Sequence, residues 1–257
     1  YYVNKIVLEF LGINDFYERT VIVFCILFSN SIVLKSVNSA VFPTSFNIQT
    51  ALAIQLIYPL IYFSLSKKWI LASIISSLMI ITHFVVAWFP VTVFSLFLIF
   101  KNKLKNKNIL LLLIPILVFI SLYIVNKNLF IDPSNNIKLI EEIFLRSQEE
   151  NLITLQPINR LLFFIITFFI FFKIKKKVIN KEFRLYLDVL FYTSLTSAVL
   201  GTAWSVIGYK ILPMVELAYL YWARSMLNYN IVFNILLLYF ISKSNLSIVK
   251  KTGLYLG

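Results

Sequence analysis

Four ionisable residues stand inside or at the ends of long apolar stretches, and their types make them the first candidates for chemistry. They are His83, Asp188, Glu216 and Arg224. An unpaired charge in hydrocarbon costs roughly 2.5–3.5 kcal/mol, so each such residue needs a partner or a function. The guanidinium fork of Arg224 matches the oxygens of a phosphate or pyrophosphate group. A structural pairing of Arg224 with a carbonyl or carboxylate on a neighbouring helix explains the residue equally well.

The other three residues have simpler explanations beside a functional one. Glu216 precedes Arg224 by about 12 Å along a helix axis, too far for a direct pair, so it needs water, a substrate or another helix. A lone His83 at the end of an apolar stretch is more often a hydrogen-bonded packing residue than a base, and we retain it as a substrate-binding candidate. Asp188 follows Arg184 by one helical turn, which predicts an ion pair within the helix.

A second set of candidates lies in the acidic segment 137–155. Its apolar residues recur at helical spacing, which predicts an amphipathic helix lying on a surface. The carboxylates of this region are those of Glu141, Glu142, Glu149 and Glu150. One of them is a candidate general base or a ligand for a donor-bound metal ion. A solvated polar face accounts for any single one of them without a function.

The elements that must position these residues are membrane helices. Of all residues 60% are hydrophobic and only 14% are charged, which is too apolar for a water-covered surface around one core. A bilayer core of about 30 Å needs roughly 20 apolar residues per helix, and about eight stretches qualify. The sequence therefore predicts an all-α, polytopic transmembrane bundle in one domain, 1–257. The predicted spans are 20–34, 48–65, 69–82, 84–100, 108–125, 160–172, 183–207 and 212–241.

Lysine placement predicts the orientation of these spans. Lysines cluster in every second connection, at 67–68, 101–107, 173–181 and 243–251, whereas the long connection 126–159 is acidic. Because cytoplasmic loops of membrane proteins carry the excess of Lys and Arg, the clusters and the C-terminus should face the cytoplasm of a bacterium, with 126–159 outside. Pro90 also allows one kinked helix with a re-entrant piece, but the pattern favours separate spans 69–82 and 84–100, because a single merged span would put Lys67 and Lys101 on opposite sides. Anionic lipid head groups are the alternative role for the clusters.

Composition and motifs exclude several other classes. The formal net charge of +13 comes from isolated clusters rather than one exposed basic face, so we expect no nucleic-acid partner. A single Cys25 provides neither a disulfide framework nor a thiolate metal site. No phosphate-binding glycine loop, paired zinc motif or nucleophile elbow is present. The sequence begins at Tyr1 rather than Met, and a truncated N-terminus is one explanation that the sequence leaves open.

Several short motifs resemble one group of membrane proteins. They are FNIQTALA at 46–53, SKKW at 66–69 and THF at 82–84, followed by FLRS at 144–147 and YLYWARS at 219–225. Together they resemble bacterial polytopic glycosyltransferases of the GT-C type and related membrane proteins of polysaccharide clusters. The early outer loop of that group carries a catalytic acid, and the corresponding segment 35–47 has none.

The resemblance implies transfer of a sugar from a polyprenyl-phosphate donor at the outer face of the inner membrane. Under it, Arg224 and Arg146 hold the donor phosphate, and one of Glu141, Glu142, Glu149 or Glu150 replaces the absent base. The cofactor is left unknown, a divalent metal ion being one option. The protein's partners would be the lipid bilayer and the donor.

Two other functions fit the same features. An O-antigen polymerase-like or flippase-like protein also combines many helices, a large outer loop and outward-facing arginines. A transporter or a non-catalytic membrane partner is the next alternative, although inverted repeats with Gly or Pro breaks are typical of transporters and only 5 glycines occur here.

The predicted topology can be tested by labelling single cysteines placed in a Cys25→Ser background. A cysteine at position 142 should react with a membrane-impermeant thiol reagent added to whole cells, and one at position 104 only after permeabilisation. Equal accessibility of both positions from one aqueous phase would contradict the arrangement.

Overall fold

The structure is a computed structural model and describes residues 1–28, 48–102, 107–126, 137–142, 171–176, 178, 180–214, 236–244 and 250–251. Every regular element in these ranges is a helix, which confirms the all-α prediction. The helices are α1 (Tyr2–Glu9), α2 (Phe16–Phe28), α3 (Ile48–Gln55), α4 (Ile57–Leu65), α5 (Trp69–Asn102), η3 (Lys107–Leu112), α6 (Leu113–Asn126), α9 (Lys181–Ala203), η7 (Trp204–Gly208) and α10 (Tyr209–Ile211). Residues 137–142, 171–176 and 236–242 are also helical.

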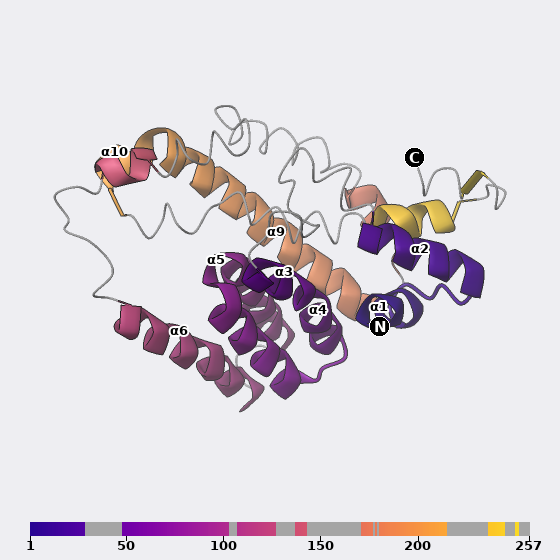
Figure 1. Cartoon of the computed structure of the whole chain (residues 1–257). Helices are drawn as coiled ribbons and strands as arrows, with labels where there is room; N and C mark the ends of the chain where they lie inside the picture. The colour runs from indigo at the N-terminus through magenta and orange to yellow at the C-terminus, as the bar shows by residue number, and fades with distance from the viewer. Residues whose placement is uncertain are drawn as a thin grey trace.

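Helix α9 runs through the length of the fold, with α1 and α2 near its beginning and α10 at its far end (Figure 1). The Asn180 side chain caps α9 by accepting a hydrogen bond from the Phe183 backbone N–H at 3.0 Å. At the other end, η7 is a π-helical turn, and the Trp204 indole N–H donates to the Leu212 carbonyl at 3.2 Å. A Cβ on Gly208 would lie 3.1 Å from Trp204 Cδ1, so glycine makes room for the folded-back indole. The indole's hydrogen bond satisfies a carbonyl at the C-terminal end of the helix, just before Pro213.

Two of the predicted spans are interrupted helices rather than continuous ones. Segment 48–65 is divided at Leu56 into α3 and α4, and segment 108–125 begins as the 3-10 helix η3 before α6 starts. Pro59 and Pro115 explain both places, because proline lacks the N–H that would bond to the carbonyl four residues earlier and its ring crowds that carbonyl. Each proline therefore interrupts the backbone hydrogen bonds of the helix, while the segments on both sides stay helical.

Helix α5 consists of two arms that fold back on each other at His83. The backbone of His83 is extended, with φ −163° and ψ 92°, and it separates arm 69–82 from arm 84–102. A straight helix would place Trp69 and Phe97 about 42 Å apart, yet their ring centroids lie 6.1 Å apart. The two predicted stretches are thus separate antiparallel helices, as the lysine pattern requires. The break falls at His83 and not at Pro90, through which the second arm continues.

No helix within the described ranges combines the length and the apolar character needed to cross a membrane. Predicted segment 20–34 is described only through Phe28, segment 160–172 only at its end, and segment 212–241 only at its two ends. Helix α1 was not among the predicted elements, because its apolar stretch is too short for a span.

Bulky side chains fill the core of the described residues. Phe171 stacks on Phe191 with centroids 4.6 Å apart, and Phe84 stacks on Phe119 at 4.9 Å. Phe97 meets Tyr186 edge-on at 5.4 Å, which joins the second arm of α5 to α9. Offset-stacked and edge-to-face aromatic pairs of this kind add about 0.5–1.5 kcal/mol each beyond the area they bury.

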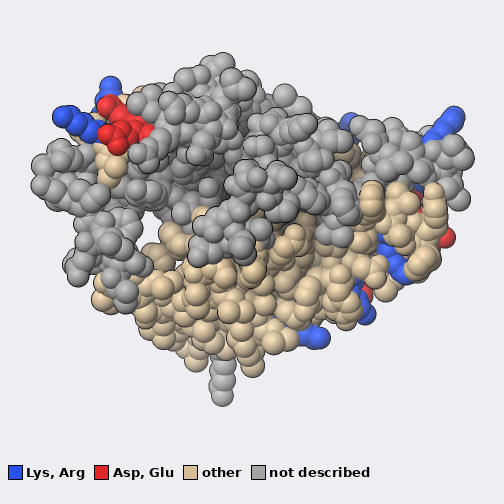
Figure 2. Space-filling model, viewed as in Figure 1, with Lys and Arg blue, Asp and Glu red and all other residues tan. Residues whose placement is uncertain are grey.

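The outer side of α5 and α6 exposes an unusual amount of apolar surface. Large side chains that remain exposed there include Ile70, Ile74, Ile81, Leu110, Leu117 and Ile124, several of them more than half exposed. In Figure 2 the lower face of the molecule carries only a few charged atoms, on the side of α1 and α2. Contiguous apolar patches of this extent are typical of surfaces that meet lipid or another protein.

Burial along the second arm of α5 predicts which of its phenylalanines stabilise the fold. Phe94 is completely buried, whereas Phe100, on the same arm, is 61% exposed. Phe94→Ala should lower the free energy of unfolding by about 3–5 kcal/mol, because it removes a buried ring and leaves a cavity. The matched control Phe100→Ala should cost less than about 1 kcal/mol. Equilibrium chemical unfolding followed by circular dichroism measures both, and equal losses would contradict this packing.

Candidate functional site

Lysines from separate connections converge on carboxylates at one end of the bundle. Glu182, at the start of α9, lies 3.4 Å from Lys67 Nζ and also forms an ion pair with Lys101. Burial opposes ionisation of Glu182, but the hydrogen bonds and positive charges of Lys101 and Lys67 outweigh it, so the pKa of Glu182 lies below its ordinary value. One carboxylate thus ties together the turn after α4, the end of α5 and the start of α9.

Lys67 reaches Glu182 from a specialised turn. Its φ is 59°, in the left-handed region where glycine is preferred. The Lys68 N–H donates to the Phe63 carbonyl at 2.9 Å and the Lys67 N–H to the Ser64 carbonyl at 3.3 Å, which is the Schellman pattern that ends a helix. A lysine adopts this left-handed conformation less readily than a glycine would, but it places a positive charge next to Glu182.

A second ion pair joins Lys175, on the helical stretch 171–176, to Asp188 on α9. The predicted ion pair of Asp188 with Arg184 on the same helix is therefore wrong. The Arg184 guanidinium donates to the Val178 carbonyl, which draws it away from Asp188. The pattern within one helix could not show that Lys175, from a neighbouring segment, lies closer.

Both chain ends contribute to the same end of the bundle. Lys251 lies 3.6 Å from Glu18 of α2, and the Tyr2 ring of α1 contacts Tyr62 at 5.6 Å, next to the turn that carries Lys67. We call the set of Lys67, Lys101, Lys175 and Lys251 with their carboxylate partners the lysine end. Within the described residues, all four basic connections therefore meet on one side, as their alternation in the sequence predicts.

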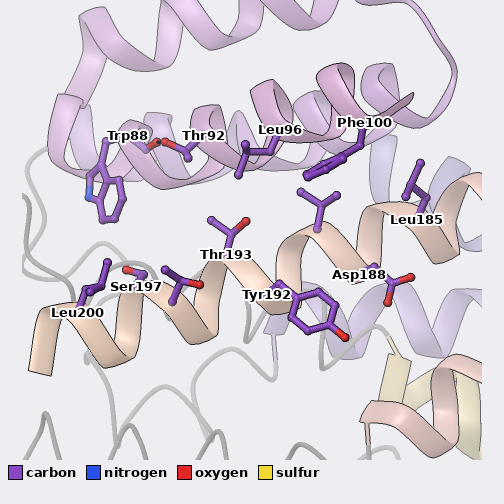
Figure 3. Close-up of a pocket in the computed structure, with 12 residues that line it drawn as sticks. Trp88, Thr92, Leu96, Phe100, Leu185, Asp188, Tyr192, Thr193, Ser197 and Leu200 are labelled. Atoms are coloured by element: carbon purple, nitrogen blue, oxygen red, sulfur yellow. Dashed lines mark hydrogen bonds between the residues drawn. The ribbon is translucent and has the colours of Figure 1, made fainter. Parts of the chain in front are cut away.

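A groove of about 640 Å³ runs between the second arm of α5 and α9. Figure 3 shows its two walls, with Trp88 and Leu200 near one end and Phe100, Leu185 and Asp188 near the other. Phe100 adjoins Lys101, so the second end of the groove lies at the lysine end. Apart from Asp188 and a few hydroxyl groups, including those of Thr193 and Ser197, the lining is apolar.

A smaller hollow of about 330 Å³ lies on the other side of the same arm, against α6. Trp88, Thr92 and Leu96 line both spaces. The Thr92 hydroxyl donates to the Trp88 carbonyl at 2.7 Å, so it is occupied within its own helix. The second arm of α5 is thus the partition between two apolar spaces.

The sequence-predicted site residues are only partly described. His83 is half-buried at the break in α5, and Glu141 and Glu142 are exposed on the stretch 137–142, whose Ile140 is buried. None of these three residues lines the groove. Arg146, Glu149, Glu150, Glu216 and Arg224 lie outside the described residues.

Within the described ranges, no group of three or more His, Cys, Asp or Glu side chains is arranged to hold a metal ion. The exposure of Glu141 and Glu142, with Ile140 turned inward, agrees with the solvated polar face that the sequence analysis kept open. The structure therefore joins neither glutamate to the groove.

Sequence reasoning did not find the groove. Its α9 wall places Thr193, Thr196 and Ser197 on one helical face, between the apolar Val189 and Leu200. The sequence did contain one signal for the groove, namely small hydroxyl-bearing residues repeated at spacings of three and four. Such small side chains leave room beside a helix whose other side chains are large. The partner wall on α5 could not be assigned to it without the fold.

Comparison with known proteins identified no relative. No family model matches the chain, and no curated protein and no solved structure is similar to it.

The Glu182 ion pairs predict a pH-dependent contribution to stability. Because the folded state lowers the pKa of Glu182, its contribution is fully present above the ordinary value of 4.5 and is lost as the pH falls through the lower, folded-state value. Glu182→Gln should lower the free energy of unfolding by about 1 kcal/mol at neutral pH, and the difference from the unsubstituted protein should disappear under acid conditions.

The matched control is Glu9→Gln. Glu9 pairs at 3.3 Å with Lys5 on its own helix, so it links no separate segments, and its loss should cost only about 0.2–0.5 kcal/mol. Chemical unfolding at a series of pH values measures both variants. A difference for Glu182→Gln that stays constant with pH would contradict the assigned pKa shift.

Proposed function

We propose that this chain is a multi-span protein of the bacterial inner membrane that transfers a sugar from a polyprenyl-phosphate donor at the outer face of that membrane. The supporting observation is the polarity of the bundle. Lysines from four connections meet at one end, and an uncharged face with exposed isoleucines and leucines lies between the ends. Membrane proteins place basic loops in the cytoplasm and apolar side chains against lipid. The lysine end would then be cytoplasmic.

The acidic stretch supports the same orientation. Figure 2 shows acidic atoms, with basic atoms beside them, at the end of the molecule away from α1 and α2, where Figure 1 draws the short helix 137–142. Glu141 and Glu142 are exposed there, in the loop proposed to lie outside. Carboxylates on the outer side could act as a general base toward an acceptor hydroxyl. Sugar transfer itself rests on the resemblance of the motifs described above, and in it Arg224 and Arg146 hold the donor phosphate.

A second function is favoured by one observation. Among the described residues, the carboxylate in the groove, Asp188, is paired with Lys175, whereas Glu141 and Glu142 are outside it. A protein that binds and passes on a polyprenyl-linked glycan, like an O-antigen polymerase or flippase, needs an apolar groove and outer arginines but no sugar-transferring base at the groove. The two functions differ in the glycan they leave behind.

Substitution of Arg224 separates these functions. In a strain whose own copy is deleted, Arg224→Ala should reduce glycan output about tenfold or more, because the donor phosphate loses a bidentate charge-assisted partner. Lys210→Ala, an exposed basic residue in the preceding outer region, is the control and should leave output unchanged. Mass spectrometry of the glycan then distinguishes the outcomes.

Loss of one sugar from the repeating unit would support the transferase. A change of chain length with unchanged composition would support the polymerase-like alternative. Unaltered glycan output in Arg224→Ala would contradict the donor-binding role.

A further inference from the structure

The groove between α5 and α9 has the dimensions of a lipid chain within one leaflet. Its walls extend from Trp88 to Phe100 along α5 and from Leu200 back to Leu185 along α9 (Figure 3). Twelve residues of helix correspond to about 18 Å, close to the roughly 15 Å that is half of a bilayer's hydrocarbon core. One extended acyl chain therefore fits along it.

Charge at the lysine end indicates what the head group would be. The described residues of the lysine-rich connections near the groove are Lys67, Lys68, Lys101, Lys173, Lys175, Lys176, Lys181 and Arg184, against the carboxylates of Glu182 and Asp188. The two carboxylates are already paired with Lys67, Lys101 and Lys175. Lys173, Lys176 and Lys181 are exposed, and none of them lies within ion-pair distance of a described carboxylate. An excess of positive charge therefore remains on the segments that border this end of the groove, where Lys101 follows the lining residue Phe100 and Lys175 pairs with the lining residue Asp188.

We propose that this groove binds one acyl chain of an anionic phospholipid from the cytoplasmic leaflet, whose phosphate lies among the lysines at that end of the groove. The inference rests on the membrane location proposed above, but not on sugar transfer. The chain would replace water along the apolar walls, which favours binding in proportion to the apolar surface that it covers. The lysines would select acidic over zwitterionic head groups. Such a lipid would seal the space between α5 and α9 and hold Asp188 away from bulk water.

Trp88 offers a direct measurement, because it lies at the end of the groove opposite Phe100 and Asp188, where the chain's tail would reach. In a Trp69→Phe, Trp204→Phe, Trp222→Phe variant, Trp88 is the remaining tryptophan of the chain. The purified variant is reconstituted into vesicles containing either phosphatidylglycerol or phosphatidylcholine with brominated acyl chains, and its fluorescence is recorded. Phosphatidylglycerol should quench Trp88 with an effective affinity on the order of fivefold or more above phosphatidylcholine, since a basic residue near the surface contributes about that factor.

Two further variants test groove and head-group selection separately. Thr193→Phe should fill the groove and abolish the preference, whereas Thr20→Phe, an exposed position on α2, should leave it intact. Lys173→Gln, Lys176→Gln and Lys181→Gln together should remove most of the preference while leaving the ion pairs of Glu182 and Asp188 in place. Native mass spectrometry of the unsubstituted protein, which counts retained phosphatidylglycerol molecules, provides the same answer if the tryptophan variant does not fold.

The outcomes separate this inference from the proposed function. Equal quenching by both lipids, or a preference that survives Thr193→Phe, would overturn the lipid site while leaving membrane location and glycan transfer standing. Absence of quenching by either lipid would overturn both the site and the membrane location. A phosphatidylglycerol preference that Thr193→Phe abolishes would support the site even if Arg224→Ala leaves glycan output unchanged.

Discussion

One carboxylate determines how the elements of this protein come together. Glu182 contacts Lys67, in the turn before α5, and Lys101, in the last turn of its second arm, and it stands in the first turn of α9. The arrangement needs α5 to fold back on itself, since both lysines could not otherwise reach one side chain. It also fixes the beginning of α9 against the open end of the α5 arms. The groove between α5 and α9 exists because these walls are held together at this end and joined farther along by the contact of Phe97 with Tyr186.

Electrostatics and aromatic packing have different tasks in this fold. The ion pairs lie at one end and are partly exposed, so each contributes little to the net free energy of folding. The buried apolar side chains of the interior, several phenylalanines among them, remove far more surface from water. The charges instead select the register in which the helices meet, because a wrong pairing would leave lysines next to lysines.

The sequence predicted the helical class and the separation of the two α5 arms well, and it predicted the finer geometry poorly. Helical periodicity and the spacing of lysine clusters are local properties that can be counted along the chain. The interruptions at Leu56 and at the start of α6 follow from Pro59 and Pro115, which a hydropathy window averages away. The partner of Asp188 could not be predicted, since Lys175 reaches it from another segment. The groove was missed for the same reason, because its walls lie about a hundred positions apart in the chain.

The fold-back at His83 also bears on how the chain acquires its structure. Its two arms are consecutive in sequence and joined by a single extended residue, so contacts such as that of Trp69 with Phe97 close only a short stretch of chain. Short-range contacts cost little loop-closure entropy and form quickly, whereas the pairing with α9 must wait for a much later part of the polypeptide. The hairpin is thus suited to be an early nucleus during synthesis, offering a preformed surface on which α9 docks once it has emerged.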